Sequence, residues 1–204
     1  MIKKALSVGL ALVALPMIGG CDVIPSSAPL APTALAESSV APVEARVGDS
    51  PTLATNQQLL AQIRQATAHF QNIDAAFAAG YVDDGFGCVD ATDFGFPASA
   101  GAMGFHLINE TLHADPETDP LRPDLLVYEP APSPQGRPKL VALEYEVFQK
   151  DWYVKHTNPP TLLGHEFEPF DFGDYGKVFA LHLWLWRDNP NGMFQDFNPK
   201  VSCR

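Results

Sequence analysis

The sequence predicts an α+β fold, in which one N-terminal amphipathic helix packs on a curved, barrel-like antiparallel sheet. Two observations predict it. Residues 56–80 place apolar side chains three and four positions apart, which is the spacing of one helix face, whereas later segments have the length and apolar content of strands. One helix followed by several strands, with proline-rich polar connections between them, is typical of the α+β class.

The helix expected over residues 56–80 has a single apolar stripe. Thr55 followed by Gln58 fits a capping box at its start, and Gly80 is well placed to end it. A single stripe implies one buried face that packs on another element. The stripe consists of Leu59, Ile63, Ala66, Phe70, Ile73 and Phe77.

Three later segments have strand character, namely residues 102–109, 139–148 and 177–186. In the first two, side chains alternate between two faces, which places His106 on one face of the first segment and Glu144 and Glu146 on one face of the second. The third is apolar on both faces, as expected for a central strand that is covered on both sides. A short strand is also expected around Leu125–Tyr128.

The segment 83–101 is rich in glycine and aspartate around Cys88. Its acidic residues are potential calcium ligands, but they lack the spacing and the closing glutamate of an EF-hand. We therefore expect a solvated loop here. The aspartates concerned are Asp83, Asp84, Asp90 and Asp93.

The N-terminus has the pattern of an export signal. Lys3 and Lys4 precede an uncharged apolar run over residues 5–18, which is shorter than the roughly 20 residues of a membrane-spanning helix. Gly19 and Gly20 then lead to Cys21. The stretch from Ile18 to Cys21 resembles the lipobox of bacterial lipoproteins, which implies cleavage after residue 20 and lipidation of Cys21. The alternative is an ordinary secretory signal near which Cys21 merely lies.

Residues 21–54 have the composition of a tether. Proline, serine and alanine make up about half of them and no apolar periodicity is visible, so this stretch lacks the surface needed to fold. We therefore expect a signal peptide over 1–20, a lipidated tether over 21–54 and a single globular domain over 55–204. The expected location is the cell envelope, outside the cytoplasm, with a lipid anchor most naturally on the periplasmic side of a bacterial membrane.

Charge excludes one class of partner. The chain carries 13 basic and 24 acidic residues, a formal charge of −11, and removal of Lys3 and Lys4 with the signal lowers it to −13. Without a basic cluster, such a chain is not expected to bind nucleic acid or anionic lipid head groups. The expected partners are the membrane, through the lipid anchor, and a small ligand or another envelope protein.

The chain has three cysteines, so an even number is left once Cys21 is used for lipid attachment. Cys88 and Cys203 then remain, in a compartment that permits disulfides. Pairing them would close most of the domain into one loop, worth roughly 4–5 kcal/mol in the chain-entropy model. Two independent thiols are the alternative. No CxxC motif is present, so thioredoxin-like redox chemistry has no support.

Three ionisable residues occupy strand interiors that are otherwise apolar: His106, Glu144 and His182. A buried ionisable group is costly unless it is paired, hydrogen-bonded or bound to metal. Two imidazoles and one carboxylate that converge on the concave side of a sheet would make a three-ligand site for zinc, copper or non-haem iron. His165 is the candidate for a fourth ligand. Glu110 and Glu166 are candidates for orienting the ligands from outside.

Other interpretations of these residues remain open. The spacing of about 38 residues between successive members lacks the specificity of a local motif, and all three residues could be structural. The protein would then be a metal-free binding or scaffold module of the envelope. A small metal-dependent hydrolase or oxygenase is a weaker alternative. Nucleophilic catalysis has little support, because no GxSxG motif occurs.

The sequence also resembles an uncharacterised family of exported bacterial proteins. The resemblance covers most of residues 56–204 and rests on short elements around the candidate ligands and at the C-terminus. It implies that the histidine-bearing strands and the last cysteine are features shared by the members of this family, and it transfers no catalytic role. The elements are Gly101-Ala-Met-Gly-Phe-His106, Leu126-Val-Tyr-Glu-Pro130, Leu143-Glu-Tyr145, Gly164-His-Glu-Phe167, Leu181-His-Leu-Trp-Leu-Trp186 and Asn198-Pro-Lys-Val-Ser-Cys203.

Overall fold

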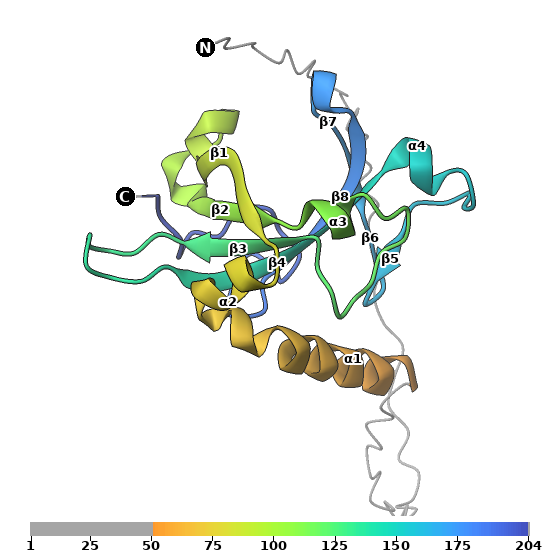
Figure 1. The fold of residues 1–204 in the computed structure, drawn as a ribbon, viewed down its shortest axis with the longest axis horizontal. Coiled ribbons are helices and arrows are strands. Elements are labelled where there is room, and N and C mark those ends of the chain that lie inside the picture. The colour runs from red at the N-terminus through yellow and green to blue at the C-terminus, as the bar shows by residue number, and fades with distance from the viewer. Residues whose placement is uncertain (1–50, 204) are drawn as a thin grey trace, which may run out of the picture. The chain divides into compact units, whose positions relative to one another are not determined.

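The computed structural model describes residues 51–203; the expected signal peptide, Cys21 and nearly all of the expected tether lie outside the described residues. A six-stranded antiparallel sheet, strongly curled into half a barrel, forms the centre of the domain (Figure 1). The predicted α+β class is therefore confirmed. The strands in spatial order are β1 (Val82–Asp90), β2 (Ala102–Ile108), β3 (Leu125–Glu129), β4 (Lys139–Phe148), β8 (Lys177–Leu183) and β7 (Glu168–Asp171), and β5 (Thr161–Leu162) and β6 (His165–Glu166) pair separately.

The helical region before the sheet contains a break that the apolar stripe does not reveal. α1 (Pro51–Thr67) continues into the 3-10 turn η1 (Ala68–Gln71), and α2 (Ile73–Ala78) follows as a separate helix. Asn72 lies between them with an extended backbone, and its side chain accepts a hydrogen bond from the backbone N–H of Asp74. Asn72 thus caps α2, as asparagine commonly does at a helix start.

This break changes which side chains of the stripe are buried. Ile63 and Phe70 are buried as expected, but Phe77, after the break, is half exposed.

None of the helices within residues 51–203 is long and apolar enough to cross a bilayer. The remaining helical elements are short: η2 (Ala91–Phe94), η3 (Ala98–Ala100), α3 (Glu110–His113), α4 (Gln149–Trp152) and η4 (Gly173–Tyr175).

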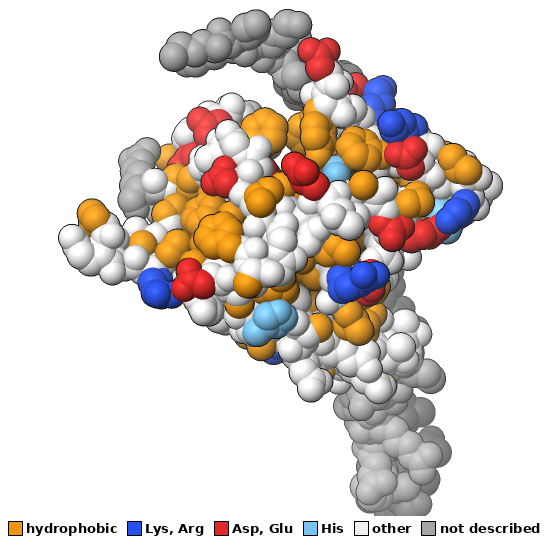
Figure 2. Space-filling model, in the orientation of Figure 1, with side chains coloured by type: hydrophobic (Ala, Val, Ile, Leu, Met, Phe, Trp, Pro, Cys, Tyr) orange, Lys and Arg blue, Asp and Glu red, His pale blue; other side chains and the backbone are white. Residues whose placement is uncertain are grey.

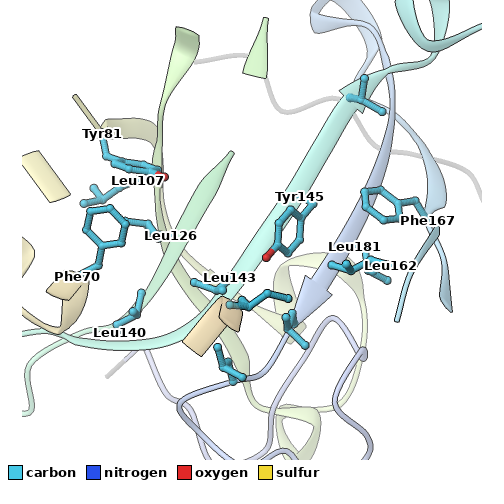
Figure 3. Close-up of a cluster of buried hydrophobic side chains, with 14 of the residues drawn as sticks. Phe70, Tyr81, Leu107, Leu126, Leu140, Leu143, Tyr145, Leu162, Phe167 and Leu181 are labelled. Atoms are coloured by element: carbon cyan, nitrogen blue, oxygen red, sulfur yellow. The ribbon is translucent and has the colours of Figure 1, made fainter. Parts of the chain in front are cut away.

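The main hydrophobic core lies between the helical region and one face of the sheet (Figure 3). Alternate residues of the central strands point into it, as the period of two requires. Tyrosine hydroxyls at its edge are satisfied by the backbone: Tyr128 donates to the carbonyl of Phe70, and Tyr81 donates to that of Pro123. The sheet contributes Leu107, Leu126, Tyr128, Leu140, Leu143, Tyr145, Val147, Phe179, Leu181 and Leu183 to this core.

The opposite face of the sheet carries a smaller apolar cluster beside the ionisable residues. A β-bulge in β4 decides which residues reach it. Val127 of β3 pairs with Ala142, whereas the next residue of β3, Tyr128, pairs with Leu140. Val141 is therefore an extra residue, so that strict alternation fails there and Val141 joins Ala142 in the smaller cluster.

Strand β1 occupies part of the segment for which the sequence predicts a loop. Asp83 pairs with Leu107 and Cys88 pairs with Phe105, so the residues between Asp83 and Cys88 all lie opposite His106. Gly85 and Gly87, both with positive φ, form this interruption. The solvated-loop prediction is thus wrong for residues 83–90, because irregular, glycine-rich pairing does not show the alternation that identifies a strand.

The disulfide between Cys88 and Cys203 is present, as the cysteine count predicts. It joins β1 to the C-terminal segment, with Cα atoms 5.6 Å apart and a sequence separation of 115 residues. Figure 2 shows acidic side chains scattered among apolar ones on one face of the molecule, and the basic side chains there lie in separate places.

We expect a Gly104→Ala substitution to lower the free energy of unfolding by about 2–4 kcal/mol. Gly104 has a φ of 115°, and a Cβ atom there would lie 2.4 Å from the carbonyl oxygen of Tyr128. Gly95 is the matched control, because its φ is 81° but nothing lies within 4 Å of its Cβ position. Gly95→Ala should cost only about 1 kcal/mol. Chemical denaturation measures both, and equal losses would contradict the steric explanation.

Candidate metal centre

Three strands bring the predicted ligands together on the face opposite the main core. Glu144 of β4 lies directly across from His182 of β8 in the antiparallel register. His106 of β2 is separated from Glu144 by one strand, β3, and reaches it across Leu125 and Val127. All three side chains are buried, between 4 and 6 % exposed. The convergence expected from the sequence is therefore present.

The distances among these groups suit a metal ion. One carboxylate oxygen of Glu144, Oε2, lies 3.3 Å from His106 Nε2 and 3.5 Å from His182 Nε2. One ligand atom from each residue lies within 4.8 Å of the other two. Zinc bonds of about 2.0–2.1 Å place two tetrahedral ligands about 3.3 Å apart, which is close to both values.

His182 Nε2 supplies a second indication. It is buried and has no hydrogen-bond partner in the described part of the chain. An unpaired buried polar atom costs free energy, and native structures avoid it unless water or an ion satisfies the group. A metal ion bound at Nε2 would satisfy it.

Two aspartates face the outer nitrogens of the histidines. Asp84 Oδ2 lies 3.8 Å from His106 Nδ1, and Asp196 Oδ1 lies 3.5 Å from His182 Nδ1. A carboxylate on Nδ1 favours the tautomer with its proton there, which leaves Nε2 free as a ligand and makes it a stronger donor. The five side chains thus form a row in which carboxylates and imidazoles alternate: Asp84, His106, Glu144, His182 and Asp196.

Neither aspartate was predicted for this role. Asp84 belongs to the segment expected to be a solvated loop, yet its side chain is only 11 % exposed. The irregular pairing of β1 opposite His106 carries it inward, and its Oδ1 accepts a hydrogen bond from Phe86 N. Asp196 lies in a polar loop without periodicity. No sequence pattern distinguishes either one from the other acidic residues.

The structure does not bring the other candidates into this group. His165 is exposed on β6, where its ring stacks on Phe194 at 3.7 Å. Glu110 is exposed at the start of α3, and Glu166 is exposed on β6. Short hairpins and helix starts at the surface direct polar side chains to water. Asp84 and Asp196 take the outer positions for which Glu110 and Glu166 were considered.

Burial and mutual attraction shift the ionisation of the three ligands in opposite directions. Burial, helped by nearby His182, lowers the pKa of His106 to about 3, so its imidazole is neutral. Burial raises the pKa of Glu144 to about 8, although His182 opposes the shift. Burial also disfavours the charged form of His182, but attraction to Glu144 and Asp196 outweighs it and raises the pKa of His182. Without a metal, Glu144 and His182 share protons; a divalent cation would replace them.

A second buried pair adjoins the centre on the same face. His113 Nε2 of α3 lies 3.0 Å from Glu146 Oε2, two residues along β4 from Glu144. Asp124 accepts a hydrogen bond from Glu146 N, and burial raises the pKa of Asp124 to about 7. The two side chains of this pair are thus partners of each other.

Two cavities in the described residues lie away from this centre. One of about 420 Å³ is lined by Thr118 and by residues of 152–161. The other, about 180 Å³ and mostly apolar, lies between α1 and the side chains of Leu163, Met193 and Phe194. Neither is lined by a residue of the centre.

Comparison with known proteins leaves the centre to be interpreted from its own geometry. No protein-family model, no curated protein and no solved structure matches this chain. The resemblance to an exported bacterial family stays a prediction.

We expect the affinity for zinc to rise with pH up to about pH 8, because the metal competes with protons on its ligands. Glu144 loses its proton with a pKa of about 8, and His182 has a raised pKa as well, whereas His106 is already neutral above about pH 3. Each displaced proton strengthens binding about tenfold per pH unit. Calorimetry in buffers of different ionisation enthalpy counts these protons. An affinity that does not change between about pH 6 and pH 8 would contradict the assignment.

Proposed function

We propose that this protein is an extracytoplasmic, lipid-anchored protein that binds one transition-metal ion through His106, Glu144 and His182. The observation that carries the proposal is the buried group of three ligand atoms within 4.8 Å of one another. Two imidazole nitrogens and one carboxylate oxygen form a donor set that suits zinc or iron(II), and copper is the third ion to test.

The outer aspartates favour a metal over a purely structural role for the histidines. Histidines that only fill a core need one hydrogen bond each, and Nδ1 would suffice. Here both Nδ1 atoms face carboxylates while both Nε2 atoms face Glu144. Anchoring one nitrogen and directing the other inward is the arrangement found at metal-bound histidines.

Binding, rather than catalysis, is the function that this geometry favours. Three protein ligands leave one position of a tetrahedral ion for water or a small ligand, which is compatible with catalysis. A hydrolase or oxygenase activity rests on no observation beyond the metal ligands themselves.

The proposed location rests on the sequence and on one structural feature. A disulfide between Cys88 and Cys203 is typical of an oxidising compartment. The apolar run over 5–18 and the lipobox-like stretch at Cys21 provide the route out of the cytoplasm and the anchor. An envelope location would expose the centre to metal ions outside the cytoplasm.

Metal binding is tested with protein purified without an affinity tag. We expect about one equivalent of a transition metal per chain, and a rise in the free energy of unfolding of about 2.7 kcal/mol at a free metal concentration one hundred times the Kd. His182→Ala and Glu144→Gln should abolish both effects, since each removes one ligand. Elemental analysis and thermal melts measure them.

His165→Ala is the matched control, because His165 is exposed and lies outside the three-ligand group. We expect this variant to keep its metal and its metal-dependent stabilisation. A wild-type protein that takes up less than about a tenth of an equivalent after reconstitution would refute the proposal. Loss of metal in His165→Ala would instead show that His165 is a ligand.

The anchor is tested separately from the metal. In a bacterial host, the full chain should fractionate with membranes and incorporate a labelled fatty acid. Cys21→Ser should remove the label and release the protein in soluble form, because the acyl chains are the expected source of membrane affinity. Fatty-acid label that persists in Cys21→Ser would contradict lipidation at this residue.

A further inference from the structure

The two aspartates that face the histidines belong to the two segments that the disulfide joins. Asp84 precedes Cys88 by four residues in β1, and Asp196 precedes Cys203 by seven residues in the C-terminal segment. The metal ligands themselves lie on β2, β4 and β8, which are paired on both sides within the sheet. The covalent cross-link therefore acts on the surroundings of the centre and leaves its ligands in place.

On the β1 side, regular pairing with β2 is interrupted where Asp84 lies. Pairing stops at Asp83 and resumes at Cys88. Nothing lies within 4 Å of the Cβ positions of Gly85 and Gly87, so no neighbouring side chain packs on the interruption at these two points. The position of Asp84 thus depends on the flanking parts of β1, one of which begins at the disulfide.

On the other side, the chain after β8 has no strand within the described residues. Asn198 exchanges two backbone hydrogen bonds with Ala102, and Val201 is buried in the smaller apolar cluster. The disulfide at Cys203 then fixes the end of the segment. Asp196 lies just before this anchored stretch, and its side chain is 36 % exposed, the most of the five alternating side chains.

We propose that the Cys88–Cys203 disulfide controls how tightly the centre holds its metal, so that reduction of the disulfide promotes metal release. This inference rests on the proposed metal-binding function. With the cross-link intact, β1 and the C-terminal segment hold Asp84 and Asp196 against the two histidines. When it opens, both aspartates gain freedom, and the imidazoles lose the partners that orient them. The three ligands stay on the sheet, so affinity falls but does not vanish.

The redox step needs a dithiol reductant, and both cysteines are half-buried rather than fully enclosed. The dithiol donates two electrons and two protons. The Sγ–Sγ bond breaks, each of Cys88 and Cys203 becomes a thiol, and the dithiol closes to its own disulfide.

The test compares zinc affinity and zinc release to a chelator for the oxidised full chain and a Cys88→Ser/Cys203→Ser variant. Protein reduced with dithiothreitol, which is then removed under argon, is the third sample. We expect the variant and the reduced protein to bind zinc about ten to one hundred times more weakly, which is the usual effect of losing partners of metal-bound histidines. The serine variant shows that new thiols are not acting as ligands.

An Asp84→Asn/Asp196→Asn variant with the disulfide intact separates the mechanism from general loosening. It should lose affinity to a similar extent, and adding the two serine substitutions to it should have little further effect, because both changes act through the same contacts. If the combined variant loses zinc affinity by the product of the two separate factors, the inference is overturned. An unchanged affinity in the serine variant would overturn it as well.

Two further outcomes are decisive. If the oxidised wild type binds no metal, the proposed function itself fails. If the serine variant loses its metal together with its far-ultraviolet circular dichroism, release follows unfolding of the whole domain, and the local mechanism is overturned. Retained circular dichroism with weakened binding supports the inference.

Discussion

One carboxylate shared by two imidazoles is the constraint on which the rest of this structure depends. Glu144 faces His106 and His182 through the same oxygen, in a place that is almost closed to water. Burying three ionisable groups costs several kcal/mol unless each finds a partner. The sheet meets this requirement by register, since Glu144 and His182 are directly paired. A shift of one residue in either strand would turn one group towards the opposite face.

The two faces of the sheet differ in what they carry. One face packs the main core, and the other carries the buried ionisable residues. Leucine, tyrosine and valine side chains of the main core pack against the helical region on one face, and they provide most of the buried apolar surface. The other face keeps only a small apolar cluster and can therefore accept charged groups. Because the carboxyls of Glu144 and Asp124 have raised pKa values, their ionised forms are disfavoured in the folded protein. The face with the ionisable residues thus reduces stability, and the packing face offsets the loss.

The fold class and the three ligands could be predicted because both leave periodic signals. An ionisable residue in the middle of an apolar strand is visible in the sequence, and the period of two assigns it to a face. The alternation predicted for β4 fails at Leu140 and Val141, where a bulge shifts the pattern. Asp84 and Asp196 could not be found in the same way, because irregular backbone carries each of them to its histidine. The break at Asn72 was hidden for a related reason, since the apolar stripe continues through a cap that interrupts the helix.

The irregular pairing of β1 has a consequence for the protein before and after it folds. An edge strand exposes backbone groups that can recruit a strand from another molecule, which is a route to aggregation. β1 is one edge of this sheet, and its interruption between Asp83 and Cys88 breaks the row of such groups. The other edge, β7, is only four residues long and contains Pro169, which has no N–H to donate. The backbone geometry that delivers Asp84 to His106 thereby also makes the sheet a poor template for a neighbouring chain.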